Sequence, residues 1–126
     1  MRLLIPLALL GAATAVELQT VRRDLPQDYT GKFLLFVQGD AVDGRAEELQ
    51  QLLQAVRESV KKEPGILTYR IARGFDEQNN RFATVEEYLN PEAFAAHQST
   101  EAYQNLINSG AIDASSTFSQ FFAKEF

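Results

Sequence analysis

Residues 43–73, DGRAEELQQLLQAVRESVKKEPGILTYRIAR, decide the fold because they place an amphipathic helix directly before a strand. The helix is predicted over Asp43–Glu63, where apolar side chains recur every three or four residues. They form one stripe of Ala46, Leu49, Leu52, Leu53, Val56 and Val60. Asp43 is expected to cap the start of this helix, and Pro64-Gly65 is expected to end it. The strand is predicted over Ile66–Arg73, with one face formed by Leu67, Tyr69 and Ile71.

Three more strands are expected around this unit, over Lys32–Gln38, Arg81–Leu89 and Thr117–Phe126. The first of them is apolar and aromatic, which is typical of a strand buried on both faces. Turn-forming residues at Asp76–Asn80 predict a hairpin between the strand at Ile66–Arg73 and the one at Arg81–Leu89.

Two short helices are predicted after that hairpin. Asn90-Pro91-Glu92 is typical of a helix start, because asparagine caps the backbone, proline suits the first turn and the acid favours the helix dipole. This helix reaches about His97. Ser99 or Thr100 starts the second helix, which Gly110 ends.

The resulting order, strand–helix–strand–strand–helix–strand, predicts one α+β domain over residues 31–126. It is a split βαβ, ferredoxin-like arrangement whose helices cover one face of a four-stranded antiparallel sheet. Phe33, Leu35 and similar residues are expected on the other face, which needs a cover. A second copy is the simplest cover. Two sheets placed face to face would form a homodimer, an α/β barrel with an apolar cavity for a small molecule.

Composition excludes several function classes. The chain has 126 residues, 45% of them hydrophobic, a formal net charge of −5, one histidine and no cysteine. No basic face is available for nucleic acid, since no run of Lys or Arg is longer than two residues. Disulfides and cysteine nucleophiles are excluded, and one histidine without cysteine cannot make an ordinary zinc site. We therefore expect no metal.

The N-terminus resembles a removable secretion signal. Met1-Arg2 carries one positive charge, Leu3–Ala13 is almost wholly apolar, and Ala13-Thr14-Ala15 is a typical cleavage site. The apolar run of about 11 residues is shorter than the ~20 that span a bilayer, so no membrane span is expected. We predict a signal peptide over residues 1–15, a poorly ordered lead-in over 16–30, and secretion. In an alga with complex plastids, the same signal could lead onward to a plastid. The alternative is a buried N-terminal strand or helix.

Two ionisable side chains stand out as site candidates. His97 lies three residues after Phe94 on the apolar side of its helix, so it could be a base or a haem ligand facing a pocket. It could equally be a helix-end histidine in contact with water. Glu86 shares a strand face with apolar neighbours, and an ion pair with Arg70 or Arg73 would lower the cost of its burial. Tyr69, Tyr88 and Tyr103 could donate hydrogen bonds to a ligand, or could simply pack.

Three stretches of the sequence, taken in order, resemble the antibiotic biosynthesis monooxygenase (ABM) family. They are Glu63–Arg70 (EPGILTYR), Asn80-Arg81-Phe82, and Glu86–His97 (EEYLNPEAFAAH). The resemblance covers roughly residues 31–110 and implies a dimeric α/β barrel, which agrees with the arrangement argued above. In this alignment His97 matches the family's helix histidine, Glu86 its strand glutamate, and Tyr88 stands where tryptophan is usual.

The resemblance implies oxygen insertion into an aromatic polyketide, phenol or quinol without metal, flavin or haem. His97 would be the catalytic base, and the substrate-binding residues would be Tyr69, Glu86, Tyr88, Phe94 and Tyr103. Ala102 stands where the family often has a second histidine, and the chain has no tryptophan, which disfavours haem degradation. Two alternatives remain open: a secreted protein that only binds an apolar ligand, and a decarboxylase or isomerase on the same fold.

Overall fold

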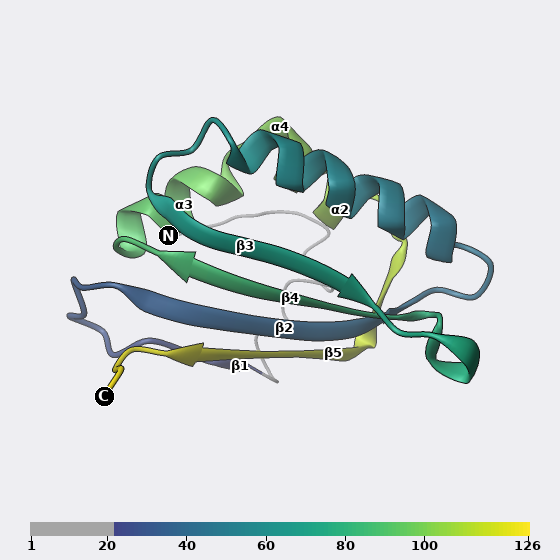
Figure 1. The fold of residues 1–126 in the computed structure, drawn as a ribbon, viewed down its shortest axis with the longest axis horizontal. Helices are drawn as coiled ribbons and strands as arrows, with labels where there is room; N and C mark the ends of the chain where they lie inside the picture. The colour runs from purple at the N-terminus through teal and green to yellow at the C-terminus, as the bar shows by residue number, and fades with distance from the viewer. Residues whose placement is uncertain (1–21) are drawn as a thin grey trace.

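The computed structural model describes residues 22–126, which form a sheet with helices on one face (Figure 1). Four long strands lie in the order β5-β2-β4-β3, and each is antiparallel to its neighbours. They are β2 (Phe33–Ala41), β3 (Ile66–Arg73), β4 (Arg81–Tyr88) and β5 (Ile112–Phe122). The two-residue strand β1 (Arg22–Arg23) pairs in parallel with β5 at one edge. The expected α+β, ferredoxin-like fold is confirmed.

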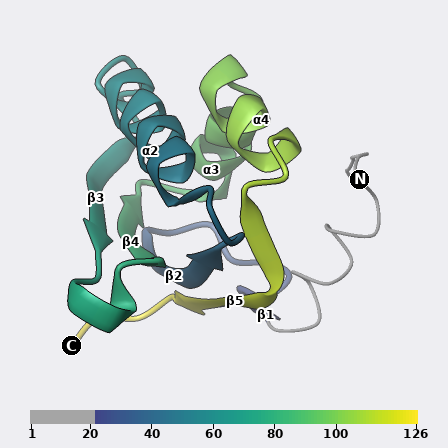
Figure 2. The same ribbon diagram turned by 90° about the vertical axis from the view of Figure 1, so that its right-hand side faces the viewer.

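Three helices cover the inner face of the sheet: α2 (Ala46–Val60), α3 (Pro91–Gln98) and α4 (Glu101–Asn108). Figure 2 shows α2 and α4 side by side above the strands, with α3 beside them. As predicted, the Asn90 side chain caps α3, accepting a hydrogen bond from the Ala93 amide at 2.9 Å. Thr100 caps α4. A short 3-10 helix, η1 (Asp76–Gln78), forms the turn between β3 and β4.

The core lies between the sheet and the helices and has two parts. One joins α2 to the sheet through Leu49, Leu53, Val56 and Phe82. The other is aromatic and gathers Phe33, Leu35, Tyr88 and Phe121. Because side chains alternate along a strand, residues 33 and 35 share the inner face with Glu86 and Tyr69 on the neighbouring strands.

That alternation corrects the sequence prediction for the first long strand. Phe33 and Leu35 face the helices, not away from them, whereas Leu34 and Phe36 point to the other face. Only one face of β2 is therefore covered by the helices. Because both faces of this strand carry apolar side chains, the sequence pattern could not distinguish the covered face from the other one.

Several element boundaries, and the placement of one side chain, also differ from the prediction. Helix α2 begins after Arg45, which has no side-chain cap, so Asp43 does not cap it. Gly44 takes a positive φ of 81° and turns the chain between the two residues. The last strand begins at Ile112, five residues earlier than expected, and ends at Phe122. Leu67 lies in a register shift between Ile66 and Thr68 and is exposed, rather than sharing the inner face with Tyr69.

The segment before the sheet is partly attached to it. The strand β1 lies inside the predicted lead-in, and the Tyr29 hydroxyl donates a 2.6 Å hydrogen bond to the Ala123 carbonyl. Part of the predicted lead-in therefore lies against the sheet. The predicted signal peptide, residues 1–15, lies outside the described residues. Within residues 22–126, no helix is long and apolar enough to cross a membrane.

The outer face of the sheet carries an apolar patch. Phe36, Val85, Phe118 and Phe122 are each between 38% and 48% exposed there, and strand pairing places them on one face. The rings of Phe36 and Phe122 lie 5.2 Å apart. We call these four residues the outer patch. It lies on the side of the sheet opposite the helices.

Candidate active site

A cavity of about 150 Å³ lies between the inner face of the sheet and the helices. Its walls are mainly apolar and come from all the long strands and helices, including Leu35, Val37, Leu49, Leu53, Phe82, Phe94, Leu106, Ile107, Ile112 and Phe121. A few polar groups interrupt these walls: Tyr69, Thr84, Glu86, Gln98, Tyr103, Thr117 and Ser119. No Lys or Arg is among the residues that line the cavity.

Glu86 is the carboxylate of this cavity, and β4 places it on the inner face. It is 5% exposed and accepts two hydrogen bonds from side chains on its own strand. The Thr84 hydroxyl donates to Oε2 at 2.6 Å, and the Tyr88 hydroxyl donates to Oε1 at 2.5 Å. Burial raises the pKa of the Glu86 carboxyl, while these donors and the charge of His97 oppose the rise. A carboxylate of this kind is a stronger base than one in water.

Tyr88 is held rigidly beside that carboxylate. It is fully buried, stacked on Phe33 at 5.2 Å between ring centroids and packed edge-on against Phe94 at 5.1 Å. Burial, with the nearby charge of Glu86 and the hydrogen bond to it, raises the pKa of the Tyr88 hydroxyl. Tyr88 therefore stays a neutral donor. Its hydroxyl donates to Glu86, but Tyr88 is not among the residues that line the cavity.

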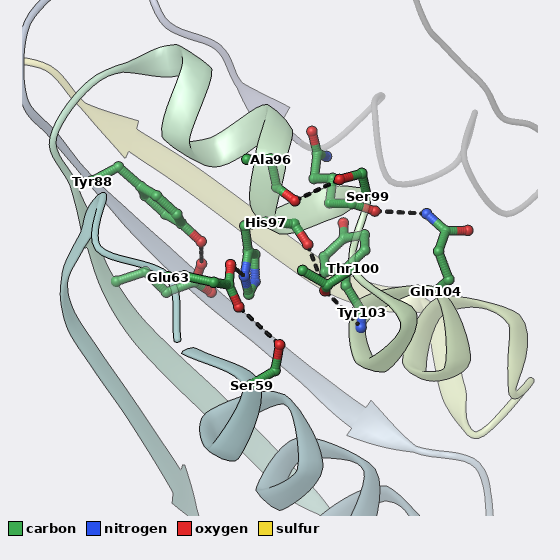
Figure 3. Close-up of polar contacts among 11 residues, drawn as sticks. Ser59, Glu63, Tyr88, Ala96, His97, Ser99, Thr100, Tyr103 and Gln104 are labelled. Atoms are coloured by element: carbon green, nitrogen blue, oxygen red, sulfur yellow. Dashed lines mark hydrogen bonds and ion pairs between the residues drawn. The ribbon is translucent and has the colours of Figure 1, made fainter. Parts of the chain in front are cut away.

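His97 also lies one layer behind the cavity wall. It is 1% exposed, and its Nδ1 lies 3.0 Å from Oε1 of Glu63, a contact that Figure 3 shows. Its ring packs against Tyr69, Tyr88 and Tyr103, at centroid distances of 5.5, 5.8 and 5.3 Å. His97 does lie in the last turn of α3, but the contact with water that this alternative expected is wrong. The residues that line the cavity do not include it.

The structure brings the predicted site residues into one region but at two depths. Tyr69, Glu86, Phe94 and Tyr103 line the cavity, and Tyr88 and His97 lie behind it. Burial raises the pKa of the Tyr69 hydroxyl, with Glu86 and Tyr103 adding to the effect, so this phenol stays protonated. Among residues 22–126, no three His, Cys, Asp or Glu side chains are grouped as ligands for a metal ion.

The expected ion pair of Glu86 is wrong. Arg70 lies on the outer face of β3, since Tyr69 and Ile71 on either side of it are paired with Glu86 and Thr84 on the inner face. Arg73 bonds instead to Glu47 at 2.8 Å. Hydroxyl donors, rather than a cation, therefore satisfy the Glu86 carboxylate.

The contact between Glu63 and His97 was not predicted from the sequence. Its partner His97 is 34 residues away along the chain, and the local pattern marks Glu63 only as a residue at the end of a helix. Its place in the Glu63-Pro64-Gly65 motif was the one available signal.

This cavity is a different one from the cavity predicted from the sequence. A single chain forms it on the helix side of the sheet, and a cavity between two sheets stays a prediction. The cause is the strand alternation described above, which turns Leu35 and Glu86 toward the helices and leaves the outer patch on the opposite side.

The family model for antibiotic biosynthesis monooxygenases matches residues 35–109, which hold the cavity's carboxylate and its helices. The chain belongs to the antibiotic biosynthesis monooxygenase family. No curated protein matches the chain significantly.

Solved structures show the same ABM fold. Protein PA3566 of Pseudomonas aeruginosa is 20% identical with a TM-score of 0.67, over 76% of this chain and 96% of that one. Protein SO0527 of Shewanella oneidensis is 17% identical with a TM-score of 0.65, over 77% and 97%. A third, called antibiotic biosynthesis monooxygenase, is 18% identical with a TM-score of 0.64, over 75% and 99%. At these identities the likeness concerns the fold alone.

Proposed function

We propose that this ABM protein is a monooxygenase for a small, neutral hydroquinone, bound in the cavity with one hydroxyl beside Glu86. The observation that carries the proposal is a buried carboxylate with a raised pKa, held by two hydroxyl donors in an otherwise apolar cavity. Membership of the ABM family supports the reaction type. In this proposal Glu86, and not His97, is the base that touches the substrate.

The size of the cavity favours one aromatic ring over several. A protein cavity of about 150 Å³ accommodates benzene, whereas drug-sized ligands need pockets of roughly 300–1,000 Å³. This cavity is of the smaller kind. Of the substrate classes expected from the sequence, a monocyclic phenol or hydroquinone therefore fits better than an aromatic polyketide.

The charge of the cavity favours a neutral substrate. Glu86 is the one carboxylate among the residues that line it, and no Lys or Arg lines it. A second carboxylate, brought in on a substrate, would face Glu86 in a medium of low dielectric, and no Lys or Arg lines the cavity to offset it. An aromatic acid should therefore bind much more weakly than its neutral analogue.

The reaction draws its electrons from the substrate. Glu86 removes a phenolic proton, and Tyr69 and Tyr103, which line the cavity, would donate hydrogen bonds to the resulting oxyanion. Addition of O₂ to the electron-rich ring forms a carbon–oxygen bond and a hydroperoxide, which takes back a proton. Loss of the ring hydrogen and cleavage of the O–O bond then release water. Hydroquinone plus O₂ gives hydroxybenzoquinone plus H₂O, which balances.

Oxygen uptake with methylhydroquinone tests this proposal. The wild-type protein should consume O₂ faster than the protein-free reaction, and Glu86→Gln should lower kcat by about 100-fold, as expected for the loss of a general base. Glu87→Gln is the matched control, because Glu87 lies on the outer side of the same strand and bonds to Thr68. Equal rates in wild type and Glu86→Gln would contradict the role of Glu86.

The outer patch supports a second proposal, that the chain forms a homodimer through this face of the sheet. A self-complementary apolar surface is what a twofold interface needs. Each copy would retain its own cavity on the far side of the sheet.

A further inference from the structure

The pair formed by buried His97 and partly buried Glu63 has no part in the chemistry described so far. Burying two ionisable groups is costly unless they compensate each other or act on a third group. Their position points to the third group. His97 packs on Tyr69 and Tyr88, and these two residues flank Glu86, one across the strand pair and one two residues along β4.

Glu63 is fixed from several sides. Its backbone amide donates to the Val60 carbonyl at the end of α2, and its own carbonyl accepts from the Ile66 amide at the start of β3. Its Oε2 accepts a 2.9 Å hydrogen bond from the Ser59 hydroxyl, which leaves Oε1 directed at His97. Figure 3 shows this row of Ser59, Glu63 and His97. The Glu63 side chain is 14% exposed and that of His97 is 1% exposed, so Glu63 is the more exposed member of this pair.

The groups that face His97 determine what its protonation does. They are Glu63 from the turn after α2, Tyr69 from β3, Glu86 and Tyr88 from β4, and Tyr103 from α4. Both acids are anionic when ionised, and burial raises the pKa of the Tyr69 and Tyr88 hydroxyls, so these two stay neutral. An imidazolium between two carboxylates leaves one net negative charge in the interior, whereas a neutral imidazole leaves two.

We propose that Glu63 is a positioning residue, which holds His97 in its protonated form beside Glu86 and so keeps Glu86 ionised as the base. This proposal rests on the proposed function, since it assigns Glu86 the role of base. It explains why a histidine that does not line the cavity is buried next to it. His97 acts on Glu86 through its charge, and Glu63 acts through His97.

The only histidine of the chain gives a direct test without any substrate. In protein labelled with ¹⁵N-histidine, one residue gives the whole signal. Near pH 7 both ring nitrogens should carry protons in the wild type, and only one should do so in Glu63→Gln. Glu63→Gln keeps an oxygen that can accept from Nδ1, and its amide NH₂ can donate to the Ser59 hydroxyl, so its fold should survive. Glu58→Gln is the control, because Glu58 lies in the last turn of α2, is exposed and is paired with Lys61.

The pH profile of kcat/KM with methylhydroquinone tests the effect on Glu86. Without the imidazolium the pKa of the Glu86 carboxyl should rise further, so the acid limb in Glu63→Gln should move to higher pH. We expect a shift of about one unit, a tenfold fall in the ionised fraction below the midpoint. KM at high pH should not change, whereas a general loss of structure would alter it.

The outcomes separate this inference from the proposed function. A protein without oxygenase activity would remove the proposed function, and the ¹⁵N spectra would still decide the role of Glu63. An active enzyme in which Glu63→Gln leaves His97 doubly protonated and the acid limb in place would overturn the inference alone. A His97→Asn variant should reproduce the shift of the acid limb, and an unmoved limb in that variant would also overturn it.

Discussion

At the scale of single residues, the proposed activity depends on the carboxyl group of Glu86, and burial disfavours the ionised form of this group. Because the pKa of Glu86 is raised in the folded chain, its contribution to stability is complete at low pH. That contribution is lost as the pH rises through the raised pKa. Glu86→Gln has no such titration, so its free energy of unfolding should gain on that of the wild type as the pH rises from 4 to 8. Urea unfolding at several pH values measures this, and a constant difference would contradict it.

The Tyr88 hydroxyl is the second prediction at this scale. Tyr88→Phe keeps the ring among Phe33 and Phe94 but removes a donor to Glu86. Loss of a hydrogen bond to a buried charged group costs about 1.5–3 kcal/mol, which urea unfolding would show near pH 8. The acid limb of the pH–rate profile should also move to higher pH. A variant as stable as wild type with an unmoved limb would mean that the hydroxyl does not support Glu86.

The sequence identified most of these residues but not their connections. Strand and helix patterns singled out Tyr69, Glu86 and Tyr103, and the resemblance to the ABM family grouped them with Phe94 as site residues. The bond between Glu63 and His97 could not, since it depends on how the end of α2 meets α3, and no periodic pattern encodes that contact.

At the scale of elements, local signals succeeded where one side chain sets the backbone. The strand Ile66–Arg73 and the caps at Asn90 and Thr100 are as predicted. The start of α2 was predicted at Asp43, but the helix begins at Ala46. The residue before it, Arg45, bonds to Glu48 and to the Ser109 carbonyl.

This difference gives a prediction for the helix caps. Asn90→Ala removes the acceptor for the Ala93 amide and should lower the free energy of unfolding by about 1 kcal/mol. Asp43→Ala should change it by less than about 0.5 kcal/mol, since Asp43 caps nothing. Thermal or urea unfolding of the two variants compares them directly. A larger loss in Asp43→Ala than in Asn90→Ala would restore the cap first predicted.

At the scale of the whole molecule, the sheet separates two apolar regions with different roles. The inner one holds the cavity, and the outer patch is open in a single chain. The order of elements correctly predicted a sheet with helices on one of its faces. It could not assign residues 33–36 to the two faces, because all four side chains in this stretch are apolar.

The outer patch predicts a dimer that one charge should weaken. The wild type should sediment as a dimer, and Phe36→Lys, at the centre of the patch, should shift it toward monomer by placing a cation in an apolar interface. Phe75→Lys is the control, since Phe75 is 81% exposed at the hairpin tip, outside the patch. Sedimentation velocity at several concentrations measures both. A wild type that stays monomeric at high concentration would contradict the dimer.

The most direct test of the central claim follows the oxygen atoms. Wild-type protein is given methylhydroquinone under ¹⁸O₂, and the product is weighed by mass spectrometry against a protein-free reaction. We expect the wild type to form a hydroxylated quinone with one ¹⁸O atom, and we expect Glu86→Gln not to form it. Unlabelled quinone with hydrogen peroxide, or hydroquinone recovered unchanged from the protein, would contradict oxygen insertion at this cavity.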